Sequence, residues 1–294
     1  MARKISSSQI RTKLRQQQNK QRQAVNKYNQ AVRKHNQNVR RAVNNYNNEV
    51  RRYNARVRAY RQKMITELNK FSSRTTIRYE VLRTSTLSLN STYQNLEAKE
   101  RDFENYEFGN EFLDLSEKEN ANSLAVSNAL ENDDQENSDF NEDGLSNTTI
   151  TIELIQISDD LDNRWKGALF SLSPRNPDAS RHFCTSAREI FIQILNHHAP
   201  DSVVLARFPE CDKTENGAPT RRWKIKYILV NAGIVSDEAV DFVDEDMKNV
   251  LQLFRVFNDG THGEVGKYEF EKLVAIKERV ESGILYLSKI SNYA

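Results

Sequence analysis

The sequence has few residues that break, bend or cross-link a chain. Its 294 residues include nine glycines, five prolines and two cysteines, and residues 8–70 contain neither glycine nor proline. Cys184 falls on an expected buried helix face and Cys211 in a polar loop, so no disulfide framework is expected and a reducing compartment is indicated. The N-terminus lacks the apolar stretch of a secretory signal, and no window approaches the roughly 18 apolar residues of a membrane span. We therefore expect a cytoplasmic protein with no membrane contact.

Acidic residues are scarce in one part of the chain and abundant in the rest. Residues 1–70 hold 19 Lys and Arg against 2 Asp and Glu, whereas the remainder holds 24 basic and 39 acidic residues. The formal net charge of +2 therefore combines a strongly basic arm with an acidic body. Such an arm predicts an anionic partner, and nucleic acid is the first candidate.

The basic arm, residues 1–72, predicts one long coiled-coil helix. Apolar and aromatic residues recur at alternating steps of three and four, with two four-residue steps around Val39, which is a heptad seam broken by one stutter. The seam comprises Val25, Tyr28, Val32, His35, Val39, Val43, Tyr46, Val50, Tyr53, Val57, Tyr60, Met64 and Leu68. Because acidic residues are so few, a self-paired parallel dimer would bring like charges together. Pairing with an acidic segment, a partner protein or nucleic acid is favoured.

Six basic residues of this arm are candidates for contact with a nucleic-acid backbone. They are Arg33, Lys34, Arg40, Arg41, Arg51 and Arg52. The tyrosines of the seam are candidates for stacking on bases. The alternative is a solvated coiled coil that serves only in assembly.

The middle of the chain predicts weaker structure. Residues 74–83 alternate apolar and polar residues and are expected to form a short strand, with a continued helix as the alternative. Residues 86–119 have a helical pattern, so 73–120 is expected to be a strand and helix segment. Residues 121–147 are expected to be an acidic disordered linker, because the stretch 131–144 has almost no apolar residue.

Residues 148–294 predict a helical bundle, so the fold class is mainly α. Four apolar helical faces follow one another and are joined by short loops. Their members are Leu154, Leu161, Trp165, Ala168, Leu169 and Leu172; Phe183, Ala187, Ile190, Phe191, Ile194 and Leu195; Val240, Val243, Met247, Val250, Leu251 and Phe254; and Phe270, Leu273, Val274, Val280, Ile284, Leu287 and Ile290. Asn176 followed by Pro177 predicts the start of the second helix.

The junction between the last two helices carries the clearest chemical motif. Arg255 ends one long helix, and His262 follows after six residues in a loop with two glycines. Imidazole suits proton transfer near neutral pH, and guanidinium suits binding of phosphate. Asn258 and Asp259 are placed to orient the imidazole. The alternative is a helix-end arginine paired with an acidic neighbour, beside a loop histidine of no special role.

The Arg-x6-His motif at this place resembles that of the HEPN superfamily, which comprises helical ribonucleases and nucleotide-binding proteins of bacterial immunity. The stretches Trp165–Leu169 and Ser186–Glu189 also resemble the predicted nucleases associated with pPIWI proteins in bacterial defence loci. The resemblance covers about residues 150–290. It implies a metal-independent, cofactor-free ribonuclease with Arg255 and His262 as catalytic residues, two protomers facing one cleft, and a defence-system partner protein.

A second polar cluster lies on the expected helix that contains Phe183. Arg181, Arg188 and Glu189 are candidates for further phosphate contacts or for positioning His262. The alternative is a solvated polar face with salt bridges at helical spacing. His197 and His198 occur together at a helix end, but no ligand set with the usual spacing accompanies them, so no metal site is expected.

Three functions remain open from the sequence. The first is a ribonuclease effector that partners hold inactive until infection. The second is a non-catalytic protein that assembles through the basic helix on nucleic acid or a partner. The third is a regulator that places its basic helix in the major groove of DNA.

Overall fold

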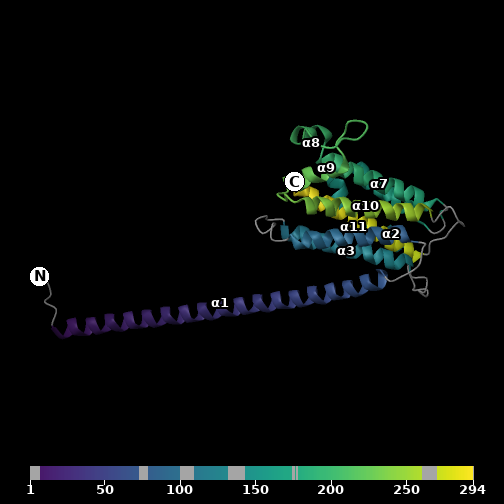
Figure 1. Cartoon of the computed structure of the whole chain (residues 1–294). Helices are drawn as coiled ribbons and strands as arrows, with labels where there is room; N and C mark the ends of the chain where they lie inside the picture. The colour runs from purple at the N-terminus through teal and green to yellow at the C-terminus, as the bar shows by residue number, and fades with distance from the viewer. Residues whose placement is uncertain are drawn as a thin grey trace. The chain divides into compact units, whose positions relative to one another are not determined.

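The computed structural model describes residues 7–72, 79–99, 109–131, 143–173, 176, 178–259 and 270–293. Figure 1 shows that these ranges are almost wholly helical, which confirms the mainly α prediction. The helices are α1 Ser7–Ser72, α2 Glu80–Ala98, α3 Gly109–Glu131, α4 Asp143–Ser146, α5 Thr151–Ile157, α6 Asp159–Ser171, α7 Ala179–His198, α8 Asp201–Arg207, α9 Arg221–Asn231, α10 Asp237–Asp259 and α11 Phe270–Asn292. Within the described ranges, the only β pairing is an isolated bridge between Lys213 and Pro219.

The chain divides into two compact units, residues 1–66 and 67–294. The first unit consists of most of α1, so the predicted long N-terminal helix is confirmed. Most of the described seam positions lie open to solvent: the exposed fractions of Tyr28, Tyr46 and Val43 are 70%, 67% and 52%. Over the described residues, no helix is long and apolar enough to cross a membrane.

The second unit contains a bundle in which α2 and α3 pack against α10 and α11 (Figure 1). The prediction of a strand over 74–83 is wrong for residues 80–83, which form the first turn of α2, while 74–78 lie outside the described residues. The expected disordered linker, 121–147, also needs correction, since residues 121–131 belong to α3. Buried Leu124, Val126 and Leu130 hold this part of α3 in the core. Burial of apolar side chains on two more helices therefore extends the bundle beyond residues 148–294.

The helices between residues 154 and 290 pack on the faces that their sequence predicts. All six apolar residues expected between 154 and 172 are buried, although Ser158 divides the segment into α5 and α6. The Ser158 hydroxyl accepts a hydrogen bond of 3.1 Å from the backbone N–H of Asp160, which caps α6. The Trp165 ring then packs against Phe183 of α7, with ring centroids 5.7 Å apart. These contacts fix α7, whose other face forms the site below.

A polar network lies inside the bundle. The guanidinium of Arg279 on α11 is fully buried and lies 2.6 Å from a carboxylate oxygen of Glu119 on α3 and 2.5 Å from one of Asp246 on α10. It also donates a hydrogen bond of 3.2 Å to Asn249, whose side-chain oxygen accepts a second bond from Ser123. This network joins α3, α10 and α11 through groups that would each be costly to bury alone.

Candidate functional site

One face of α7 lines a pocket with side chains at helical spacing. Arg188, Phe191, Ile192, Leu195 and Asn196 follow one another at steps of three, one, three and one, which places them along a single stripe. Phe191 and Leu195 are each 4% exposed, so they form the floor, while Arg188 and Asn196 are exposed at the two ends.

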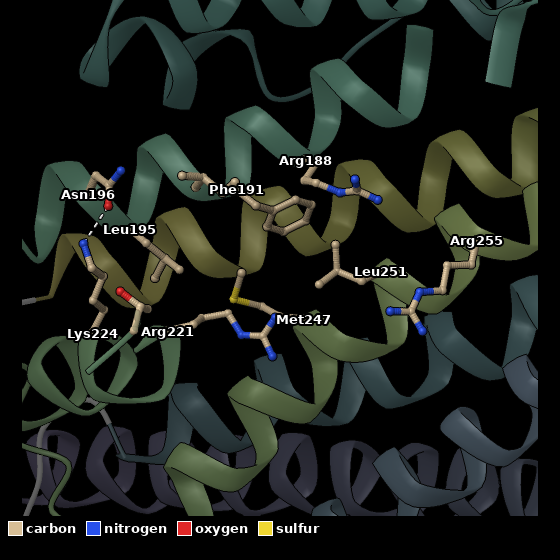
Figure 2. A pocket seen from close by; sticks show the side chains of 11 residues that line it. Arg188, Phe191, Leu195, Asn196, Arg221, Lys224, Met247, Leu251 and Arg255 are labelled. Carbon is tan, nitrogen blue, oxygen red and sulfur yellow. Dashed lines mark hydrogen bonds between the residues drawn. The ribbon is translucent and has the colours of Figure 1, made fainter. Parts of the chain in front are cut away.

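Helix α10 supplies the opposite wall. Met247, Leu251 and Arg255 lie four residues apart and therefore share one face of the helix. Figure 2 shows Arg188 and Arg255 toward one end of the pocket, with Leu251 and Met247 on the way to the other end. Among the described residues, neither Arg188 nor Arg255 has a carboxylate partner. Two cations, neither paired with a carboxylate of the described residues, thus lie at one end of an apolar floor.

Helix α9 adds two cations that are held by neighbouring carboxylates. The Nε of Arg221 lies 2.8 Å from a carboxylate oxygen of Asp244, and Nζ of Lys224 lies 2.5 Å from one of Asp201. Burial tends to raise the pKa of Asp244, but Arg221 and Lys248 outweigh it, so this pKa lies below its ordinary value. Asp244 therefore remains a carboxylate that positions Arg221 at the pocket.

The pocket has a volume of about 620 Å³, and Thr214 completes its lining. This volume lies within the range of pockets that bind small organic ligands. None of the eleven lining side chains is a carboxylate, whereas four are cationic. The arrangement suits an anionic ligand that also carries an apolar, flat part.

Only some of the predicted site residues line the pocket. Arg188 and Arg255, predicted from separate motifs, line the same pocket. Arg181 is exposed two turns before Arg188 on the same face of α7, and Glu189 is half-buried; neither lines the pocket. His262 lies outside the described residues. Asn258 and Asp259 belong to the last turn of α10.

The predicted contacts of α1 with nucleic acid concern six side chains that are all exposed. Arg33, Lys34, Arg40, Arg41, Arg51 and Arg52 lie on the described part of α1. Within that described part, the printed sequence offers only Glu49 and Glu67 as acidic neighbours. The positive charge of the helix is thus largely without internal compensation.

Two other side chains of α7 have perturbed pKa values, and that of Cys184 argues against a thiolate nucleophile beside Arg188. Burial raises the pKa of the Cys184 thiol to about 12, although Arg188 opposes the shift, so Cys184 is a thiol at neutral pH. Burial and the neighbouring His197 lower the pKa of His198. Over the described ranges, no three His, Cys, Asp or Glu side chains are grouped to hold a metal ion.

Asn196, Arg221 and Lys224 also line the pocket but were not predicted as site residues from the sequence. A signal for Asn196 is present, because it continues the stripe of α7 by eight residues from Arg188. No comparable signal exists for Arg221 and Lys224. Their place at the pocket depends on where α9 packs, which the local pattern does not determine.

Comparison with known proteins agrees with the resemblance seen in the sequence. Residues 154–287 match the family described as predicted pPIWI-associating nuclease. This part of the chain, which includes all the pocket residues, is therefore similar to predicted nucleases. Neither the curated proteins nor the solved structures gave a match to the chain.

Proposed function

Proceeding from the match of residues 154–287 to predicted nucleases, we propose that the protein is a metal-independent endoribonuclease of a bacterial antiphage defence system. Arg255 and His262 are its catalytic residues. The observation that carries the proposal is the meeting of Arg255 with Arg188 at one end of a pocket that no carboxylate lines. This end is suited to a phosphodiester, because guanidinium groups bind phosphate oxygens in paired hydrogen bonds.

The chemistry assigns one role to each member of the pair. His262 takes the proton of a ribose 2′-hydroxyl, and the 2′-oxygen attacks phosphorus. Arg255 stabilises the charge of the phosphorane that forms. The bond from phosphorus to the 5′-oxygen then breaks, and the leaving oxygen takes up a proton. The products are a cyclic phosphate and a 5′-hydroxyl.

Residues around the pair support it. Arg188 and Arg181 contact phosphates on either side of the scissile one, since both are exposed on one face of α7. Asn258 and Asp259 orient the imidazole, and Glu189 helps to place it. A homodimer brings two such motifs to one cleft, as the resemblance to HEPN ribonucleases implies.

Helix α1 supplies the long-range attraction for RNA. Its exposed Arg33, Lys34, Arg40, Arg41, Arg51 and Arg52 contact the phosphate backbone. Such contacts release counterions, so binding weakens steeply with added salt. The matched family is described as pPIWI-associating, and a pPIWI protein is the proposed defence partner.

The test is cleavage of labelled RNA by the full chain in EDTA. We expect His262→Ala and Arg255→Ala to lose activity by about 100-fold or more, because each removes an acid–base or charge-stabilising group. Arg207→Ala is the matched control: Arg207 is an exposed arginine at the end of α8 that does not line the pocket. Cleavage that persists in His262→Ala, or that requires a divalent cation, would contradict the proposal.

A second function is favoured by the exposed seam of α1. Most of its described Val and Tyr positions lie open to solvent and provide a surface for assembly without catalysis. Under this alternative, the full chain binds nucleic acid or a partner but cleaves no RNA, with or without divalent cations. Removal of residues 1–66 would then abolish all binding.

A further inference from the structure

The proposed reaction uses only one end of the pocket. Between Arg188 and Asn196 the stripe on α7 continues for eight residues, or about 12 Å at 1.5 Å per residue. The remaining length is too great for a phosphate group alone. It is on the scale of a phosphate together with its sugar and base.

The middle of the pocket is apolar and suits a flat ring. Phe191, Leu195 and Met247 are almost fully buried, and Leu251 completes the surface between them and Arg255. Figure 2 shows these side chains between the two polar ends. Aromatic and thioether side chains pack well on flat rings, and a base that stacks on such a surface contributes about 1–3 kcal/mol.

The far end presents a hydrogen-bond donor in a fixed orientation. Nζ of Lys224 donates a hydrogen bond of 2.6 Å to the side-chain oxygen of Asn196, and Asp201 holds the same ammonium group at 2.5 Å. Since the Asn196 oxygen accepts from Lys224, its amide nitrogen is the group left to donate to a ligand. Figure 2 shows this nitrogen on the side away from Lys224. An amide N–H in this place matches a carbonyl oxygen on a base.

We propose that the pocket binds one nucleotide unit, with its phosphate between Arg188 and Arg255, its base over Phe191, Met247 and Leu251, and a carbonyl of the base at Asn196. In RNA this unit adjoins the scissile phosphate, a role that rests on the proposed function. Binding of a free nucleotide does not rest on it. Asn196 is then a residue that determines base specificity, and the bases with a carbonyl oxygen (uracil, guanine and cytosine) are preferred over adenine, which has none.

The test is binding of the four 5′-nucleoside monophosphates to the full chain, measured by calorimetry beside inorganic phosphate and ribose 5-phosphate. We expect the monophosphates to bind at least 10-fold more tightly than either reference, and UMP, GMP and CMP more tightly than AMP. Arg188→Ala and Arg255→Ala should each weaken binding about 10-fold, whereas Arg207→Ala should not. The last control removes the same charge from a site outside the pocket and so corrects for non-specific attraction.

Two further variants separate the parts of the pocket. Leu251→Trp should fill the base position, so that UMP binds no better than inorganic phosphate. Asn196→Ala should remove the preference for UMP, GMP and CMP over AMP. Since Asn196 is exposed, its truncation to alanine leaves no cavity in the core. Monophosphates that bind no better than inorganic phosphate, or binding that Arg188→Ala and Leu251→Trp both leave unchanged, would overturn the proposal.

The outcome is distinguishable from that of the proposed function. RNA cleavage without nucleotide binding at the pocket would remove the nucleotide site and leave the reaction standing. Nucleotide binding that depends on Arg188 and Asn196, with no RNA cleavage, would support the site and remove the reaction.

Discussion

The buried charges of the bundle predict an unusual dependence of stability on pH. Arg279 contacts two carboxylates, those of Glu119 and Asp246, so the fully ionised cluster would carry one excess negative charge inside the protein. Burial raises the pKa of Glu119 to about 8, with Asp246 adding to the shift and Arg279 opposing it. We therefore expect the folded protein to keep a proton on Glu119 at neutral pH.

The sign of the effect follows from where that proton is lost. The unfolded chain releases it near the ordinary value of 4.5, whereas the folded chain holds it up to about 8. Between these values the folded state binds one more proton, so stability falls as pH rises, by about 1.4 kcal/mol per pH unit. The stability that this proton gives the folded state is present in full below pH 4.5 and is lost by about pH 8. The total is at most about 5 kcal/mol, a large part of the stability of an ordinary domain.

Glu119→Gln isolates this effect, because glutamine has a similar shape and never ionises. The free energy of unfolding of the variant should equal that of the unmodified chain near pH 5. Near pH 9 it should be higher by several kcal/mol, at most about 5. Urea unfolding from pH 5 to 9, followed by the fluorescence of buried Trp165, gives the difference. Glu80→Gln, at the exposed first residue of α2, is the control for loss of a carboxylate. Parallel pH profiles for Glu119→Gln and the unmodified chain would refute the reasoning.

Three further predictions test the packing and the two units. Gly283→Ala should destabilise the protein by up to about 2 kcal/mol in urea unfolding, because an added Cβ would lie 3.2 Å from the Phe191 ring, and this overlap outweighs the gain of about 1 kcal/mol in helix propensity; an unchanged or higher stability would contradict it. Thr148→Val should cost about 1–3 kcal/mol by the same measurement, since it removes the hydroxyl that accepts a 2.8 Å hydrogen bond from the Trp165 indole; a neutral change would contradict this role. Deletion of residues 1–66 should leave the thermal unfolding of residues 67–294 unchanged and reduce the salt dependence of RNA binding, measured by fluorescence anisotropy.

The local pattern of the sequence was sufficient for the helices and for part of the site. Helical periodicity depends on residues within two turns. The long α1 and the apolar faces of α6, α7, α10 and α11 can therefore be predicted from the sequence. The same locality explains why Arg188 and Arg255 were found from separate motifs. Each stands on a helix whose position could be predicted.

Only the tertiary structure decided which faces meet. Acidic composition predicted a linker over residues 121–147, yet residues 121–131 belong to α3, and Glu119 of that helix is buried against Arg279, 160 residues away. Likewise, Arg221 and Lys224 reach the pocket because α9 packs beside α7 and α10. The physical reason is that the cost of burying a charge depends on the partner it finds in space, and a one-dimensional pattern does not contain that partner.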